Sequence, residues 1–168
     1  DSAYYGLDPH DVITLWIGFT DATPGNGCMR ILPGSHKWPD QKHDETYDGD
    51  NLLARGQTIV GLDDSAAVEM PLKAGQFSMH HERMLHSSGP NLSDDRRLGM
   101  SFTYLPTRTR CILGRRTATL VRGVDDYHHW DYDPAPRADL DPVCMETIQY
   151  WIKAYADPDV IQEGQRTG

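Results

Sequence analysis

Short apolar runs separated by glycine and proline fill the chain as far as about residue 122. Runs rich in β-branched and aromatic residues are typical of strands, and clusters of Gly and Pro are typical of turns. The ranges predicted as strands are 12–19, 28–32, 77–81 and 97–105, with shorter ones at 57–62 and 111–113. We therefore expect a mainly β fold, an antiparallel sandwich or barrel, of which the double-sheet jelly roll is one form.

The pattern changes to that of a helix near the C-terminus. Asp141 precedes Pro142, which is a favourable N-cap followed by a favourable first helical residue. The apolar residues that follow at helical spacing are Val143, Ile148, Trp151, Ile152 and Tyr155. Asp157 and Pro158 would end the helix. We expect one domain over 1–168, with a jelly-roll core at about 1–122 and a connector and helix at about 123–168.

Residues 35–65 are polar and lack a clear strand pattern apart from 57–62. A loop of this length in a compact domain is usually either functional or disordered. Because it follows a predicted core strand, we expect it to close over a bound substrate.

The composition is that of an ordinary globular chain: 168 residues, of which 38% are hydrophobic and 24% charged. The net charge of −9 disfavours non-specific binding to nucleic acid. No apolar run is long enough to span a membrane, and three widely spaced cysteines do not suggest a disulfide framework. These features favour a cytoplasmic protein with reduced thiols and without a membrane partner.

Charge is distributed unevenly along the chain. Residues 83–122 contain eight arginines and two acidic residues, whereas 123–168 are strongly acidic. Two interpretations remain open: two solvated surfaces of opposite sign, or an arginine-rich entrance that attracts an anionic substrate.

The segment from His86 to Arg97 carries the clearest chemistry. It combines an imidazole, a common metal ligand, with a guanidinium eleven residues later that is suited to a carboxylate. His80 and His81 are rival ligands, and spacing alone does not choose among the three histidines. Arg96 is the rival of Arg97, and adjacent residues of a strand face opposite sides, so one of the two arginines would face the interior.

Together with Asp1 and the segment 26–37, Asn-Gly-Cys-Met-Arg-Ile-Leu-Pro-Gly-Ser-His-Lys, the segment 86–97 resembles the phytanoyl-CoA dioxygenase family of iron(II)- and 2-oxoglutarate-dependent oxygenases. The resemblance spans most of residues 1–107. It implies a double-stranded β-helix, the cupin-like form of the jelly roll. It also implies that Asp1 and His86 are metal ligands and catalytic residues, that Arg97 is a catalytic residue binding 2-oxoglutarate, and that Ser88 and Trp16 line the co-substrate site. Core packing is a nearly equal alternative for Trp16.

The resemblance implies an enzyme that uses Fe(II), 2-oxoglutarate and molecular oxygen to hydroxylate an unactivated C–H bond of a small organic substrate. Related halogenases carry Ala or Gly in place of the aspartate, so Asp1 favours hydroxylation over halogenation. Desaturation and epimerisation are other outcomes of the same chemistry, and a jelly-roll binding module without turnover is the alternative from another class. The oligomeric state is open.

The first ligand of the family is a histidine two residues before the aspartate. The sequence begins at Asp1 and does not contain that histidine. Either the chain is the C-terminal major part of a longer oxygenase, or its metal site is degenerate, and we favour the first because the remaining motif residues are intact. We expect the chain alone to retain metal weakly and to have little activity.

Overall fold

The computed structural model describes residues 5–39, 41–44 and 58–156. The chain divides into two compact units. The first unit comprises Asp1–Tyr4, His10–Lys42 and Val60–Pro106, and the second comprises Tyr5–Pro9, His43–Ile59 and Thr107–Gly168. The expectation of one domain over 1–168 stays a prediction.

A three-stranded antiparallel sheet forms one layer of the first unit. Strand β2 (Ile13–Gly18) lies at its centre, between β5 (Phe77–His81) and β7 (Gly99–Tyr104). In the register of β2, Thr14 pairs with His80 and Trp16 pairs with Ser78. Side chains alternate along a strand, so these four residues share one face of the sheet.

The opposite face of this sheet is apolar. The side chains that it exposes include those of Ile13, Phe77, Met79, Met100, Phe102 and Tyr104. Both faces therefore follow from one alternating sequence pattern, with polar groups on the face of Thr14 and His80 and apolar groups on the other.

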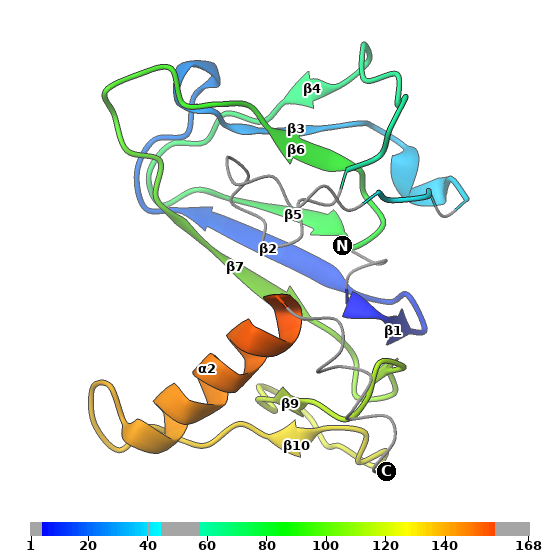
Figure 1. The fold of residues 1–168 in the computed structure, drawn as a ribbon, viewed down its shortest axis with the longest axis vertical. Coiled ribbons are helices and arrows are strands. Elements are labelled where there is room, and N and C mark those ends of the chain that lie inside the picture. The colour runs from blue at the N-terminus through cyan, green and yellow to red at the C-terminus, as the bar shows by residue number, and fades with distance from the viewer. Residues whose placement is uncertain (1–4, 40, 45–57, 157–168) are drawn as a thin grey trace. The chain divides into compact units, whose positions relative to one another are not determined.

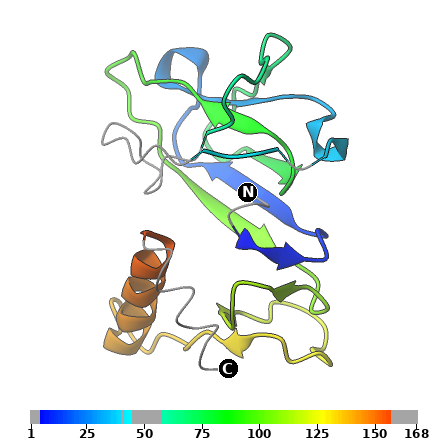
Figure 2. The ribbon, with the colours of Figure 1, turned by 45° about the vertical axis from the view of Figure 1, so that its right-hand side comes forward.

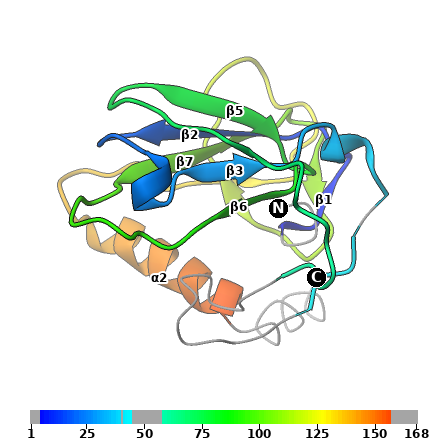
Figure 3. The same ribbon diagram turned by 90° about the horizontal axis from the view of Figure 1, so that it is seen from above.

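A second three-stranded antiparallel sheet forms the other layer of the first unit. Strand β3 (Met29–Ile31) lies between β4 (Val68–Glu69) and β6 (His86–Ser88). Figures 1 and 3 show the two sheets next to each other. Two small antiparallel sheets whose strands come from interleaved parts of the sequence are the jelly-roll arrangement, so the predicted mainly β fold is confirmed.

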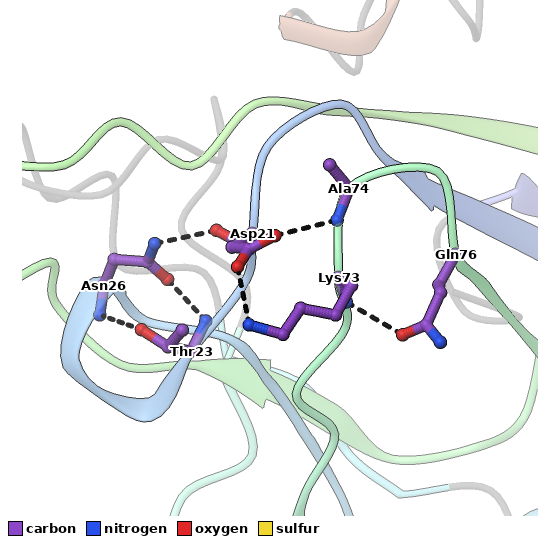
Figure 4. Close-up of polar contacts among 6 residues, drawn as sticks. All are labelled: Asp21, Thr23, Asn26, Lys73, Ala74 and Gln76. Atoms are coloured by element: carbon purple, nitrogen blue, oxygen red, sulfur yellow. Dashed lines mark hydrogen bonds and ion pairs between the residues drawn. The ribbon is translucent and has the colours of Figure 1, made fainter.

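A tight turn joins β2 to β3 (Figure 4). Its short helix η1 (Pro24–Asn26) is capped by Thr23, whose side chain accepts a hydrogen bond from the Asn26 backbone, while the Asn26 side chain accepts one from the Thr23 backbone. The Asn26 amide also donates to the carbonyl of Asp21 at 2.9 Å. The Asp21 carboxylate in turn accepts hydrogen bonds from Lys73 Nζ and the Ala74 backbone N–H.

Gly27 ends this turn with a φ of 77°, in the left-handed region. A Cβ at this position would lie 2.5 Å from the carbonyl oxygen of Gly89. The Leu92 N–H donates to the Gly25 carbonyl at 3.0 Å. The turn therefore packs directly against the loop that follows β6, and Gly27 is needed both for its conformation and for this close approach.

Within the described residues, the second unit contains two strand pairs and the C-terminal helix (Figure 2, where the helix is orange to red). Strand β1 (Leu7–Asp8) pairs antiparallel with β8 (Arg110–Cys111), and β9 (Thr117–Ala118) pairs parallel with β10 (Asp131–Tyr132). The Trp151 indole of the helix donates to Thr117 Oγ1 at 3.1 Å.

Helix α2 (Pro142–Ala156) begins where its sequence signals place it. The Asp141 side chain accepts a hydrogen bond from the Val143 N–H at 3.0 Å and is held by Arg137 at 2.8 Å. The guanidinium of Arg137 and the backbone N–H groups of Arg137 and Val143 lower the pKa of Asp141 to about 2. The N-cap predicted from the sequence is therefore confirmed. In the described part of the chain, no helix is both long and apolar enough to cross a membrane.

Some sequence expectations were wrong or incomplete. The strand expected at 57–62 reduces to one bridge between Asp44 and Thr58, with residue 57 outside the described residues. The connector expected between the jelly-roll core and the helix contains β10. Residues 40 and 45–57 of the expected substrate-covering loop at 35–65 lie outside the described residues. The short strand expected at 111–113 overlaps β8 at Cys111. The other two-residue strands were missed because two residues are too few to show an alternating pattern.

Replacement of Gly27 by alanine should destabilise the first unit more than replacement of Gly34. Gly34 has a similar φ of 83°, but a Cβ there meets no atom within 4 Å. Gly34→Ala should cost about 1–2 kcal/mol for the left-handed conformation, and Gly27→Ala should cost more because the Gly89 carbonyl must also shift. Urea unfolding of both variants measures the difference, and equal losses would contradict the packing argument.

Replacement of Asp141 by alanine should lower the thermal stability of the helix in a pH-dependent way. Because the pKa of folded Asp141 lies below its ordinary value of 3.8, its stabilising effect is full above about pH 4 and is lost as the pH falls toward 2. The unfolding midpoints of wild type and Asp141→Ala should therefore differ near neutral pH and converge in acid. Asp139→Ala, at an exposed position nearby, is the control and should show no such convergence.

Candidate functional site

His86 begins strand β6 and faces the other sheet of the first unit. Its Nδ1 lies 2.9 Å from the carbonyl oxygen of Met84. A carbonyl oxygen can only accept, so Nδ1 carries the proton and Nε2 carries the lone pair. A backbone carbonyl bonded to one ring nitrogen commonly orients a histidine that binds metal through the other.

The rings of His80 and His86 lie next to each other across the two sheets, with centroids 4.9 Å apart. Burial lowers the pKa of both imidazoles, and for His80 the proximity of His86 lowers it further, to about 4. Although part of His86 is exposed, both rings are therefore neutral near neutral pH. A neutral imidazole is the form that binds metal.

The face of β5 that looks toward His86 is polar and buried. His80 is 8% exposed and Ser78, two residues earlier, is 6% exposed. Neither ring nitrogen of His80 nor the hydroxyl of Ser78 has a hydrogen-bond partner within the described part of the chain. These are donors and acceptors that a bound molecule could use.

His81 lies on the opposite face of β5. Its Nδ1 accepts a hydrogen bond from the Arg83 N–H at 3.2 Å, and its ring centroid is 6.1 Å from that of His36. Strand alternation turns it away from His86. Of the three histidines that spacing left open, the rings of His80 and His86 lie together and that of His81 does not.

Arg97 lies two residues before β7 and is half-buried, whereas Arg96 is exposed. The Arg97 guanidinium carbon is 5.6 Å from the centroid of the Trp16 ring, a distance typical of a cation–π contact. The Trp16 indole itself packs over Gly99, where no side chain fits beneath it. Trp16 thus contacts the predicted co-substrate arginine rather than only filling the core.

Ser88 is the third residue of β6, so it shares the face of His86. It pairs with Met29 of β3. Arg97 lies near Cys28, the residue before β3. Burial raises the pKa of the Cys28 thiol, and the nearby positive charge of Arg97 slightly opposes this rise. Four predicted site residues, Trp16, His86, Ser88 and Arg97, therefore lie in the first unit on elements that face one another.

Asp1, the predicted carboxylate ligand, lies outside the described residues. Among the residues that are described, no group of three or more His, Cys, Asp or Glu side chains is placed to hold a metal ion. The described donor set fits iron in one respect: His86 offers a neutral, oriented imidazole beside polar groups that lack partners.

Sequence reasoning missed one polar contact of the first unit. Nδ1 of His10 lies 2.9 Å from Oε1 of the fully buried Glu82. The two residues are 72 positions apart, so no local pattern could have paired them. The unpartnered groups of Ser78 and His80 were also not anticipated, since a sequence does not show which buried polar atoms lack partners.

These features define a jelly-roll protein with a candidate metal ligand at the start of β6 and a candidate carboxylate-binding arginine in the loop before β7. The chain matches the family model described as phytanoyl-CoA dioxygenase (PhyH) over residues 1–99. The chain belongs to the phytanoyl-CoA dioxygenase family, and the resemblance inferred from the sequence motifs is confirmed.

Individual relatives agree with this assignment. A protein of Stutzerimonas stutzeri named as a probable alpha-ketoglutarate-dependent hypophosphite dioxygenase is 33% identical over 116 residues, which cover 68% of this chain and 41% of that protein. The peroxisomal phytanoyl-CoA dioxygenase of Bos taurus is 30% identical, over 60% of this chain and 31% of its own length. The chain thus spans less than half of the length of these two relatives.

Solved structures also match. The apo form of the non-heme monooxygenase ThoJ has a TM-score of 0.76 and 31% identity, covering 100% of this chain and 60% of ThoJ. The epimerase SnoN, solved with Fe3+, alpha ketoglutarate and nogalamycin RO, has a TM-score of 0.52 and 28% identity, covering 66% of this chain and 42% of SnoN. Both support the jelly-roll assignment.

Replacement of His86 by alanine should abolish metal binding by the protein expressed from its complete gene. Loss of a ligand should weaken the affinity for Ni(II) by about a hundredfold or more, beyond the 10–100-fold typical of a residue that only orients a ligand. His81→Ala, on the opposite face of the same sheet, should change it little. Isothermal titration of Ni(II) into each variant checks this. An unchanged affinity in His86→Ala would exclude His86 as a ligand.

Proposed function

We propose that this chain forms the co-substrate and metal region of an iron(II)- and 2-oxoglutarate-dependent oxygenase that hydroxylates a small organic substrate. The observation that carries the proposal is the combination of His86, with its proton held on Nδ1, and Arg97, packed on Trp16, at the spacing characteristic of the family. Family membership supports the same chemistry.

In this proposal His86 Nε2 and the Asp1 carboxylate hold the metal. A bound iron(II) would supply the activation of oxygen that protein side chains cannot provide. The hydrogen bond from His86 to the Met84 carbonyl fixes the direction of the imidazole, so Nε2 is oriented before the metal arrives.

Arg97 binds the distal carboxylate of 2-oxoglutarate in this proposal. A guanidinium donates two parallel hydrogen bonds to a carboxylate, and the contact with Trp16 restricts the positions that the guanidinium samples. Ser88, on the face of β6 that also presents His86, adds a hydroxyl donor. The arrangement binds a dicarboxylate at its far end and leaves its 2-oxo acid end for the metal.

The substrate is proposed to be a small molecule, and molecular oxygen to be the second reactant. An anionic substrate is favoured by the arginines between residues 83 and 122. Hydroxylation is favoured over halogenation by the aspartate at position 1. The match to a protein named as an epimerase supports epimerisation as a second outcome. Three free cysteines, Cys28, Cys111 and Cys144, support a reducing location such as the cytoplasm.

Replacement of Arg97 by alanine should abolish turnover of 2-oxoglutarate, whereas Arg96→Ala should not. Loss of two charge-assisted hydrogen bonds should raise the KM for 2-oxoglutarate by about a hundredfold or more. Arg97→Lys should recover only part of this, because an ammonium group lacks the planar fork. Formation of succinate by the complete gene product with iron(II) measures the effect. Equal losses in the Arg96 and Arg97 variants would contradict the assignment.

A further inference from the structure

Ser78 and His80 present an unusual pair of side chains. Both are more than nine-tenths buried, and three of their polar atoms lack partners within the described residues. Folded proteins pair almost all buried polar atoms, because an unpaired one keeps the cost of losing water without compensation. Two such residues on one face of one strand indicate a surface that is completed by a bound molecule.

Their positions are set by the register of β5 with β2. His80 pairs with Thr14 and its ring lies against that of His86, the candidate metal ligand. Ser78 pairs with Trp16, the residue that contacts Arg97. Two residues along a strand span about 6.5–7 Å. The unpartnered groups therefore follow the direction from the candidate metal ligand toward the candidate carboxylate-binding arginine.

The chemistry of these groups suits an oxygen-rich anion. A hydroxyl and a neutral imidazole can each donate one hydrogen bond, and a carboxylate or a keto oxygen can only accept. The opposite face of the same sheet, which carries Met79, is mainly apolar. The donors therefore occur on the side where an acidic co-substrate would lie.

We propose that Ser78 and His80 bind the 2-oxo dicarboxylate co-substrate between the metal and Arg97, with His80 donating to an oxygen near the metal and Ser78 donating nearer the guanidinium. This inference rests on the proposed function and adds two binding residues to it. His80 acts here as a hydrogen-bond donor and not as a metal ligand.

The test uses the protein expressed from its complete gene, with Ni(II) in place of iron so that no turnover occurs. The variants are Ser78→Ala, His80→Phe and His80→Gln. Met79→Ala is the matched control, since Met79 lies between them on β5 but is 61% exposed on the other face. Calorimetry gives the Kd of Ni(II) and then the Kd of 2-oxoglutarate for the Ni(II)-loaded protein. Thermal unfolding is measured without metal or co-substrate.

Ser78→Ala and His80→Phe should each raise the Kd of 2-oxoglutarate by about tenfold, the effect of one lost hydrogen bond. His80→Gln, which keeps an amide donor, should recover part of the affinity. The Kd of Ni(II) should stay within about twofold of wild type, because in this proposal neither residue binds the metal or orients a ligand, and loss of an orienting residue typically changes metal affinity by about 10–100-fold. The unfolding midpoint of the ligand-free protein should stay the same or rise in Ser78→Ala, because an unpaired polar atom is removed.

Unchanged 2-oxoglutarate affinity in both Ser78→Ala and His80→Phe would overturn the proposal. Loss of Ni(II) binding in His80→Phe would also overturn it and would make His80 a ligand. A lowered ligand-free midpoint in Ser78→Ala, with normal 2-oxoglutarate affinity, would assign the residue to packing. If wild type itself showed no metal-dependent binding of 2-oxoglutarate, the proposed function would fail as well. If Arg97→Ala lost that binding while these variants kept it, only the present inference would fail.

Discussion

The register of β2 between β5 and β7 is the constraint on which the candidate site depends. It places Thr14, Trp16, Ser78 and His80 on one face and the apolar side chains on the other. A shift of one residue would turn every one of these side chains to the opposite face. The pairing of the strands therefore determines both the polar face with Ser78 and His80 and the position of Trp16 next to Arg97.

The second support of the site is the packing of two loops in the first unit. The close approach of Gly27 to the Gly89 carbonyl, and the hydrogen bond from the Leu92 N–H to the Gly25 carbonyl, tie the turn after β2 to the loop after β6. That loop leads from the metal-ligand candidate to the candidate arginine. The turn that contains Asn26 and Gly27 and the loop that contains Gly89 and Pro90 therefore pack directly against each other, although they are far apart in the sequence.

Much of the architecture could be read from the sequence because its signals are strong and local. The strand predicted at 77–81 matches β5, and the helix beginning after Asp141 matches α2, since alternation and an N-cap are both short-range patterns. The two-residue pairings β1–β8 and β9–β10 could not be predicted, because they depend on partners about 15 to 100 residues away.

The candidate site, like the fold, was predictable only where the signal is local in the sequence. Motif spacing and family resemblance predicted His86, Arg97, Ser88 and Trp16 as site residues. The separation of His80 from His81 required the strand register, which spacing does not give. The bond between His10 and Glu82, and the unpartnered atoms of Ser78 and His80, depend on tertiary packing that no local pattern records.

The central claim is that one site in this protein holds a metal on His86 and a dicarboxylate on Arg97. A crystal structure of the protein from its complete gene, grown without oxygen in the presence of iron(II) and 2-oxoglutarate, tests it most directly. The account predicts iron bound to Nε2 of His86, with the distal carboxylate of 2-oxoglutarate on the Arg97 guanidinium. Iron held elsewhere, or 2-oxoglutarate bound away from Arg97, would contradict it.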